Sequence, residues 1–206
     1  MPVRYTATEI ARKYDSIAVR YDRAEWIAER LLFKRLRRGI FSRARGDVLE
    51  VATGTGCNLE YYPPDCRITA IDISEGMLDI ARQRANELGK AVDFRLMDGA
   101  ALDFADDCFD TVTTSLSTCT FPDPLVVLRE MRRVCKPDGR ILLLEHGRSS
   151  VQLFGRLQDR LADRQARAFG CHWNREPQQL IEQAGLRLVS DRTHLFGVVH
   201  VVEATP

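Results

Sequence analysis

Long hydrophobic segments are missing from this sequence of 206 residues. No apolar run approaches the ~18 residues that mark a membrane-spanning helix, so we expect no such helix. The first ten residues, MPVRYTATEI, contain no apolar core of a signal peptide, which argues against secretion. Apolar residues nevertheless make up 45% of the chain, which is enough for a substantial core. We therefore expect a single domain over residues 1–206 and a cytoplasmic location.

The chain also lacks a paired-cysteine motif. None of its six cysteines forms a C-x-x-C arrangement, and several fall within apolar segments. This pattern disfavours a zinc site and a disulfide framework, so we expect reduced thiols and no metal. The six are Cys57, Cys66, Cys108, Cys119, Cys135 and Cys171.

Excess charge of one sign is nearly absent, because the net charge is only +1, but the charges are unevenly placed. Residues 1–46 hold twelve basic and five acidic side chains, a net charge of +7, and the remainder has a net charge of −6. A basic segment on an acidic body suits phosphate-bearing partners, so we expect peripheral contact with an anionic membrane, at its inner surface. A solvated helix face explains the same charges equally well.

Hydrophobic spacing predicts two regions of different structure. Residues 1–46 are typical of amphipathic helices and predict an N-terminal helical cap. From Val48 onward strand-like and helical runs alternate, which predicts an α/β fold with a mostly parallel sheet and helices on both faces. The last two strand-like runs, 186–191 and 196–204, are joined by a short loop and should pair antiparallel.

An insertion over residues 147–173 follows the fifth strand-like run. Leu153, Leu157 and Leu161 share one face of a helix here, and four arginines, at positions 156, 160, 164 and 167, form a second stripe. We interpret the segment as an amphipathic helix that covers the site as a lid, or that meets a lipid surface. The alternative is a helix that packs on the body and exposes its arginines to solvent.

A glycine turn over residues 48–62, VLEVATGTGCNLEYY, indicates the ligand. It lacks the lysine of a phosphate-binding P-loop, and Leu59 stands where a dinucleotide site has its third glycine. Glu50 lies within the strand, and Asp72 and Asp98 end the next two strand-like runs. Acids at this rim bind ribose hydroxyls and cationic groups, so the pattern favours a nucleoside with a cationic tail and no phosphates.

These motifs resemble those of class I S-adenosylmethionine-dependent methyltransferases over residues 48–145. EVATGTG is similar to the first motif of the group that includes the UbiE quinone methyltransferases, with alanine at position 52, and AIDISEGMLDIARQRA is similar to the second strand and helix. The resemblance implies a Rossmann-like seven-stranded sheet with a reversed last strand and S-adenosylmethionine as cofactor. It places the cofactor against Tyr21, Glu50, Ala52, Gly54, Gly56, Asp72, Ile73, Met77, Met97, Asp98, Gly99 and Ser115.

The methyl acceptor is less constrained by the sequence. LLLEHGR and GCHWNREP resemble segments of animal microsomal thiol S-methyltransferases, and the body with its basic N-terminal helix resembles bacterial phosphatidylethanolamine N-methyltransferases. We therefore expect a thiol or a phospholipid amine as acceptor. C- or O-methylation of a quinone or phenol is the alternative, although the Y-x-Y-L-like stretch of quinone methyltransferases is missing. RNA methylation is disfavoured because there is no N-P-P-[YF] motif, and a nucleic-acid partner is not expected.

Three residues are candidate catalytic groups. The resemblance places Tyr21 over the methionine end of the cofactor, with Tyr14 as a weaker candidate. His146 follows the fifth strand, and His172 lies at the end of the insertion. A neutral imidazole at either place would take a proton from the acceptor. Each histidine has an alternative role as a hydrogen-bonded wall residue, and Asn174 is a candidate N-cap for the next helix.

Overall fold

The computed structural model describes residues 5–206, without the side chains of residues 24–26 and 28. The helical elements are α1 (Ala7–Ala28), a π-helix (Glu29–Phe33), α2 (Lys34–Phe41), a 3-10 helix (Leu59–Tyr61), α3 (Glu75–Glu87), α4 (Pro124–Val134), α5 (Gln152–Phe169) and α6 (Pro177–Gln183). The strands are β1 (Asp47–Val51), β2 (Arg67–Asp72), β3 (Val92–Leu96), β4 (Phe109–Ser115), β5 (Cys135–His146), β6 (Arg187–His194) and β7 (Val199–Thr205).

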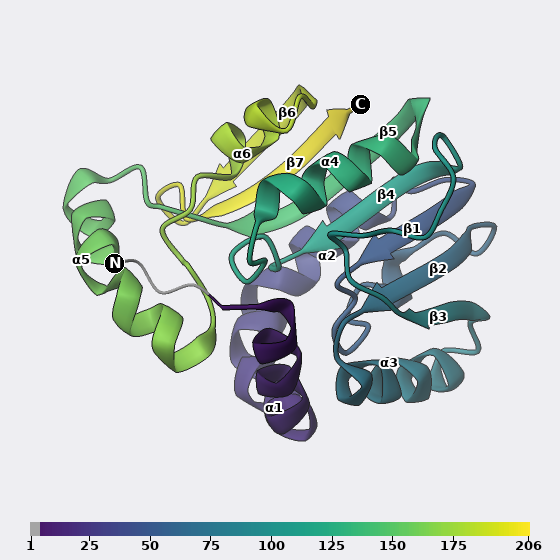
Figure 1. Ribbon diagram of the computed structural model, residues 1–206, viewed down its shortest axis with the longest axis horizontal. Helices are drawn as coiled ribbons and strands as arrows, with labels where there is room; N and C mark the ends of the chain where they lie inside the picture. Colours follow the sequence, from purple (N-terminus) through teal and green to yellow (C-terminus); the bar gives the residue numbers. More distant parts are fainter. Residues whose placement is uncertain (1–4) are drawn as a thin grey trace.

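One seven-stranded sheet forms the centre of the molecule, in the order β3-β2-β1-β4-β5-β7-β6 (Figure 1). Neighbouring strands from β3 to β5 pair in parallel, with Val48 opposite Ile68 between β1 and β2. Strand β7 pairs antiparallel with both β5 and β6. The expected Rossmann-like fold with a reversed last strand and a terminal antiparallel hairpin is therefore confirmed.

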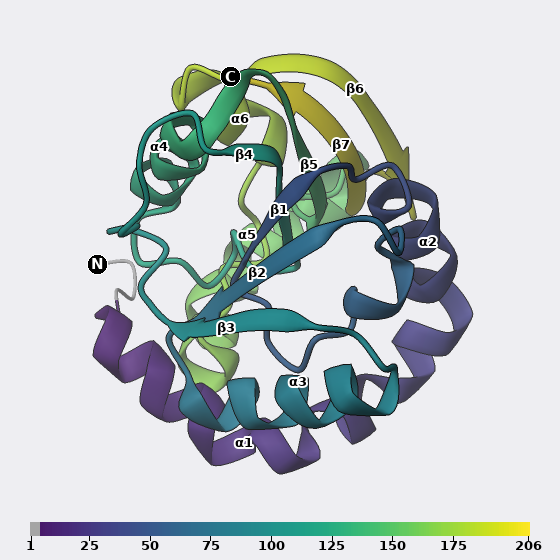
Figure 2. The ribbon, with the colours of Figure 1, turned by 90° about the vertical axis from the view of Figure 1, so that its right-hand side faces the viewer.

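Helices cover both faces of the sheet, as the alternating pattern predicts (Figure 2). On one face, β1, β4, β5 and β7 pack against α4 and α6 in an apolar cluster that includes Leu128, Met131 and Ile181. On the other face, α2, α3 and the 3-10 helix supply Phe41, Leu59 and Ala85 to a second cluster. These two buried layers fix the strands whose carboxyl ends carry the candidate site.

The starts of two helices agree with their sequence signals. Ser74 accepts a hydrogen bond from the amide of Met77 at 3.1 Å and caps α3. Asp123 caps α4, with Pro124 at the first helical position. The expectation for Asn174 is wrong, because α6 begins at Pro177 after Glu176. The Asn174 side chain instead donates to Asp159 at 3.1 Å and ties the segment to α5.

The N-terminal cap is helical as expected, but a π-helical turn separates α1 from α2. Glu29 opens this turn and pairs with Arg37, whose Nε lies 3.0 Å from the Glu29 carboxylate. Such turns widen a helix locally and often lie at functional sites. Helix α1 packs along α3, with Asp15 accepting from the amide of Gly76 at 3.0 Å and Asp22 pairing with Arg84. The cap is thus attached to the glycine-turn side of the sheet.

Helix α5 confirms the amphipathic helix expected in the insertion, and Figure 1 shows it set apart from the sheet on the side where α1 lies. Its leucine face does not pack on the body, because Leu153 is 75% and Leu157 52% exposed. The residues it buries are Gly155, Gln158 and Ala166. Among residues 5–206, no helix is long and apolar enough to cross a membrane.

Candidate active site

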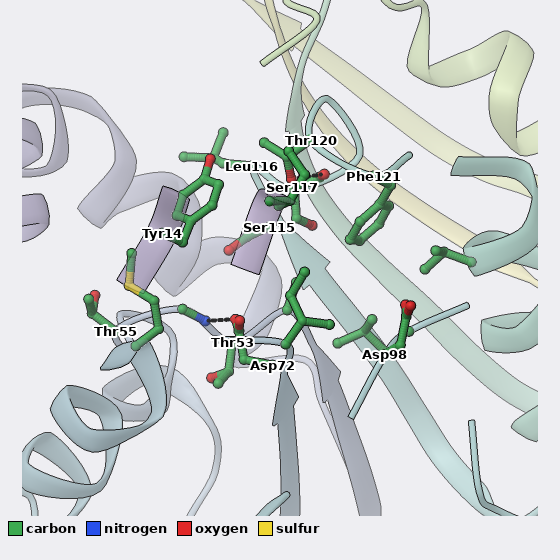
Figure 3. Close-up of a pocket in the computed structure, with 18 of the residues that line it drawn as sticks. Tyr14, Thr53, Thr55, Asp72, Asp98, Ser115, Leu116, Ser117, Thr120 and Phe121 are labelled. Atoms are coloured by element: carbon green, nitrogen blue, oxygen red, sulfur yellow. Dashed lines mark hydrogen bonds between the residues drawn. The ribbon is translucent and has the colours of Figure 1, made fainter. Parts of the chain in front are cut away.

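A pocket of about 930 Å³, counting the part open to solvent, lies where the parallel strands end. Its walls come from the turns after β1, β2, β3 and β4 and from α1. Figure 3 shows Tyr14, from α1, on the opposite side of the pocket from Asp98. Of the predicted cofactor residues, those that line the pocket are Tyr21, Ala52, Gly54, Asp72, Ile73, Met77, Met97, Asp98, Gly99 and Ser115.

The glycine turn after β1 has a strained backbone. Ala52 has a φ of 55°, a left-handed conformation that costs a residue with a Cβ free energy. Gly54 has a φ of 57°, and a Cβ added there would meet no atom within 4 Å. Gly56 does not line the pocket. A Cβ added to it would lie 2.8 Å from Leu59. The first of these glycines keeps the turn open to a ligand, and the second allows close packing behind it.

Asp72 is held by backbone donors at the end of β2. Its Oδ2 accepts from the amide of Gly54 at 2.8 Å and its Oδ1 from the amide of Ser74 at 2.9 Å. The side chain lines the pocket, and burial raises its pKa. Each oxygen keeps further acceptor capacity, so the oriented carboxylate suits the two ribose hydroxyls of S-adenosylmethionine.

Glu50 lies behind the glycine turn rather than in the pocket wall. Its Oε1 accepts from the Asn58 amide group at 2.7 Å, so part of its role is to order the turn. Burial raises its pKa to about 7. Its Oε2 and the hydroxyl of Thr53 are buried without a hydrogen-bond partner. Thr53 lines the pocket, so its hydroxyl is available to the amino group that the cofactor's methionine end would bring, whereas Glu50 acts from behind the turn.

Arg37 belongs to the site although sequence reasoning missed it. This buried guanidinium donates from Nη1 to Asn58 Oδ1 at 2.5 Å and to Ser115 Oγ at 2.7 Å, and it lines the pocket. It thus joins α2, the glycine turn and the end of β4. Its position within a basic, amphipathic stretch made it look like one more surface arginine. The buried Glu50 was the available signal, because a buried acid calls for a cation nearby.

Part of the pocket lining suits an adenine ring. Met77, Met97, Ile73 and Gly99 all line the pocket. Asp98 accepts from the amide of Ala100 at 2.9 Å, which holds its carboxylate at the rim. Polarisable thioethers and a neighbouring acceptor match the faces and the exocyclic amine of the base that the resemblance implies. The residues present therefore fit S-adenosylmethionine.

Two tyrosines of α1 face this pocket together. The rings of Tyr14 and Tyr21 lie 6.1 Å apart between centroids, and both line the cavity. Burial raises the pKa of Tyr14 well above its ordinary value, so its phenol stays neutral. Sequence analysis favoured Tyr21 over Tyr14, and the structure places both in the wall.

The two candidate histidines lie beside the pocket rather than in its wall. His172 lines an adjoining hollow with Arg175, and Thr120 and Phe121 border both spaces. Burial and the charge of Arg175 lower the pKa of His172, which keeps its ring neutral at neutral pH. His146 ends β5, and its Nε2 lies 3.4 Å from the thiol of Cys171.

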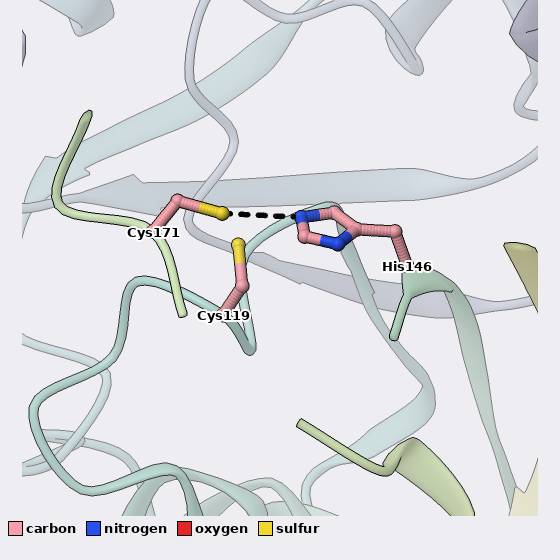
Figure 4. A group of neighbouring side chains, drawn as sticks. All are labelled: Cys119, His146 and Cys171. Carbon is pink, nitrogen blue, oxygen red and sulfur yellow. Dashed lines mark hydrogen bonds between the residues drawn. The ribbon is translucent and has the colours of Figure 1, made fainter. Parts of the chain in front are cut away.

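Cys119 and Cys171 meet next to His146, although they are 52 positions apart in the sequence (Figure 4). A hydrogen bond from Cys119 and the neighbouring His146 lower the pKa of Cys171 to about 5, whereas the pKa of Cys119 is raised. All six cysteines are free thiols. Without a C-x-x-C spacing, nothing in the sequence indicated that these two come together.

Comparisons with known proteins agree with this geometry. The family model for a methyltransferase domain matches residues 49–143. The mitochondrial methyltransferase OMS1 of Saccharomyces cerevisiae is 32% identical over 92% of this chain and 45% of its own length. A phosphatidylethanolamine N-methyltransferase of Cereibacter sphaeroides is 40% identical over 49% of this chain and 51% of its own. The chain spans about half the length of each of these two relatives.

Two further comparisons cover more of the other protein's length. A putative methyltransferase from Bacillus halodurans shares the fold, with a TM-score of 0.67 and 19% identity, over 84% of this chain and 94% of that one. A demethylmenaquinone methyltransferase of Paenarthrobacter aurescens is 30% identical over 91% of this chain and 75% of its own length. Together with the pocket, these likenesses show that the chain belongs to the class I S-adenosylmethionine-dependent methyltransferases.

Proposed function

We propose that this protein transfers a methyl group from S-adenosylmethionine to an amphiphilic acceptor at a membrane surface, with a phospholipid amine as the leading case. One observation carries the acceptor proposal: the exposed apolar and basic face of α5, described below. The phosphatidylethanolamine N-methyltransferase among the relatives supports it, because it is 40% identical over 103 residues.

Methyl transfer requires the protein mainly to align the acceptor with the cofactor. Bound S-adenosylmethionine supplies a methyl group on a sulfonium, and an acceptor that attacks this methyl carbon in line would release S-adenosylhomocysteine. Asp72 and the turn at Gly54 hold the nucleoside, and the neutral phenol of Tyr14 closes one side against water. The loop of Ser117 and Thr120 forms the wall at the end of β4. The neutral ring of His172 is available to take the acceptor's proton.

An apolar surface lies where α5 meets the β6–β7 turn. Phe154 on α5 and Phe196 in the turn form an aromatic pair with centroids 6.3 Å apart, and they are 50% and 69% exposed. Leu153, Leu157 and Leu195 extend the surface and are also exposed. We call these five residues the α5 apolar face.

Strain and charge both support the proposal that the α5 apolar face meets a membrane surface. Leu195 and Phe196 hold positive φ angles of 49° and 56°, which is costly for side chains that gain no burial here. Arg156 and Arg160 are exposed on the same helix, within one turn of Leu157. Apolar residues flanked by arginines suit the boundary of an anionic bilayer, where rings and leucines enter the acyl region and guanidinium groups meet phosphates.

A thiol is the second candidate acceptor, and a different observation favours it. Arg175 donates from Nη1 to the carbonyl of Phe121 at 2.9 Å, which places a cation beside the wall formed by Thr120. A cation and a neutral His172 near the acceptor would lower a thiol's pKa and accept its proton. Quinone methylation remains the alternative that the relatives' names suggest.

A labelled-methyl assay tests the proposal. The purified protein is given S-adenosylmethionine labelled in the methyl group with vesicles of phosphatidylethanolamine and an anionic lipid, with small thiols, or with phenols and quinols. We expect label in the phospholipid headgroup. Label in the thiols alone would favour the second candidate acceptor, a thiol, over a phospholipid amine. Label in none of the acceptors would contradict the proposal.

A further inference from the structure

The group formed by Cys119, His146 and Cys171 has a geometry that the methyl transfer does not require. Cys119 is in the loop after β4, His146 ends β5, and Cys171 follows the last residue of α5 by two positions. One donor atom from each residue lies within 4.8 Å of the other two. Figure 4 shows both thiols pointing toward the imidazole. Three separate elements therefore direct soft donors to one point.

The distance between two of these donors matches that on a tetrahedral metal ion, and the third donor lies within 4.8 Å of both. Zinc binds thiolates at about 2.3 Å and imidazole nitrogen at about 2.0–2.1 Å, so a sulfur and a nitrogen on one tetrahedral zinc lie roughly 3.6 Å apart. The thiol of Cys171 and the Nε2 of His146 are 3.4 Å apart. Thiolate and imidazole donors in this number select zinc over the harder cations.

The surroundings hold the donors in place. The amide of His172 donates to the carbonyl of Cys119 at 2.8 Å, which fixes the two cysteine segments against each other. Cys119 is 2% exposed, and the other two are partly buried. Arg175 donates to the carbonyl of Phe121 at 2.9 Å, which ties the segment after α5 to the loop that carries Cys119.

We propose that Cys119, His146 and Cys171 bind one Zn²⁺ ion through these three side chains, with an exogenous ligand in the fourth position. Among the described side chains, no further cysteine, histidine or carboxylate joins the group. Three protein ligands and one open position are the arrangement of zinc sites that bind a water or a substrate. A disulfide between the cysteines is the competing use of the pair, and zinc uptake under reducing conditions distinguishes the two.

Metal binding would also fix the insertion. The three ligands connect the end of α5 to the ends of β4 and β5, and Ser117 and Thr120 of the same loop line the cofactor pocket. The ion would therefore hold the acceptor-side wall in one position. This inference does not rest on the proposed acceptor, because the ion's binding is measured without any methyl transfer.

The test is zinc stoichiometry and affinity on the full chain, purified under reducing conditions and loaded with Zn²⁺. We expect about one zinc per wild-type chain. Cys119→Ser, Cys171→Ser and His146→Gln should each weaken zinc binding at least about 100-fold, because changes even outside the ligand shell cost 10–100-fold. Cys66→Ser and Cys108→Ser are the controls, since these two half-buried cysteines lie outside the group, and they should bind zinc like the wild type.

Cobalt provides a second measurement that needs no variant. Co²⁺ in place of zinc should give the visible bands of a tetrahedral ion with thiolate ligands, and 2-mercaptoethanol should shift these bands by entering the fourth position. A spectrum that 2-mercaptoethanol leaves unchanged would contradict the proposal that the fourth coordination position is open. A wild-type chain that takes up no zinc, ligand variants that bind as well as the controls, or a Cys119–Cys171 disulfide that forms in air while no metal binds would overturn the site itself.

Discussion

The carboxylate of Asp72 accepts the backbone N–H of Gly54 at 2.8 Å. This hydrogen bond ties the end of β2 to the glycine turn after β1, so the acid proposed to bind the ribose is held to the turn proposed to admit the nucleoside. A second bond, from the amide of Ser74 at 2.9 Å, fixes the other oxygen. Orientation of the acid is thus built into the backbone before any ligand arrives.

Replacing Ala52 by glycine should make the protein more stable. Its φ of 55° is strained for alanine but not for glycine, so Ala52→Gly should raise the free energy of unfolding by up to ~1 kcal/mol, after the larger unfolded-state entropy of glycine is subtracted. Urea unfolding measures this. The control is Ala85→Gly in α3, which should instead lose ~1 kcal/mol. Equal losses at both positions would contradict the strained turn.

Glu50 should make stability depend on pH in a definite window. Burial raises its folded pKa from 4.5 to about 7, so between these values the folded chain holds a proton that the unfolded chain has lost. Stability from this group is therefore present at low pH and falls as pH rises toward 7.

The variant Glu50→Gln isolates that effect, because glutamine is neutral throughout and keeps an acceptor for Asn58. Relative to the wild type, it should gain stability on the order of 1–3 kcal/mol between pH 4.5 and pH 7. Chemical unfolding of both proteins at several pH values gives the difference. A difference that does not change with pH would show that Glu50 is ionised in the fold.

The α5 apolar face should control membrane binding. Phe154→Asp places a charge where we expect acyl chains, so binding to anionic vesicles should fall at least about tenfold, in line with the ~1–3 kcal/mol that a buried aromatic side chain contributes. Vesicle flotation measures it, and high salt should weaken wild-type binding through Arg156 and Arg160.

Leu88→Asp is the matched control for that experiment. Leu88 is 41% exposed at the end of α3, outside the α5 apolar face, so its replacement should leave flotation unchanged. If both variants bind vesicles like the wild type, the face does not meet the bilayer. Binding lost equally in both would indicate a general charge effect.

Much of the fold could be predicted from the sequence because the signals were local. Alternating strand and helix patterns predicted the parallel sheet, and Ser74 and Pro124 marked helix starts that the structure confirms. The short loop between the last two strands predicted the reversed β7. The π-helical turn at Glu29 has no such local signal, and the Arg37 that pairs with Glu29 bonds to Asn58 and Ser115 across the fold.

The candidate site was predictable where a motif brings its residues together. Glycine-turn and strand-end residues such as Gly54, Asp72 and Asp98 do line one pocket. Contacts between residues far apart in the sequence were not predictable, and the contact of Cys119 with Cys171 is the clearest case. The exposure of Leu153 also escaped prediction, because amphipathic spacing shows that a helix has an apolar face but not what covers it.

Calorimetric titration with S-adenosylmethionine, on the wild type and on Asp72→Ala, tests the central claim most directly. We expect one molecule per wild-type chain and an affinity weakened by ~1–3 kcal/mol in the variant, because the ribose hydroxyls lose a charged acceptor. Asp93→Ala, which removes an exposed acid of β3 paired with Arg95, should leave the affinity unchanged. No heat of binding with the wild type, or equal affinity in all three proteins, would contradict the assignment of this pocket.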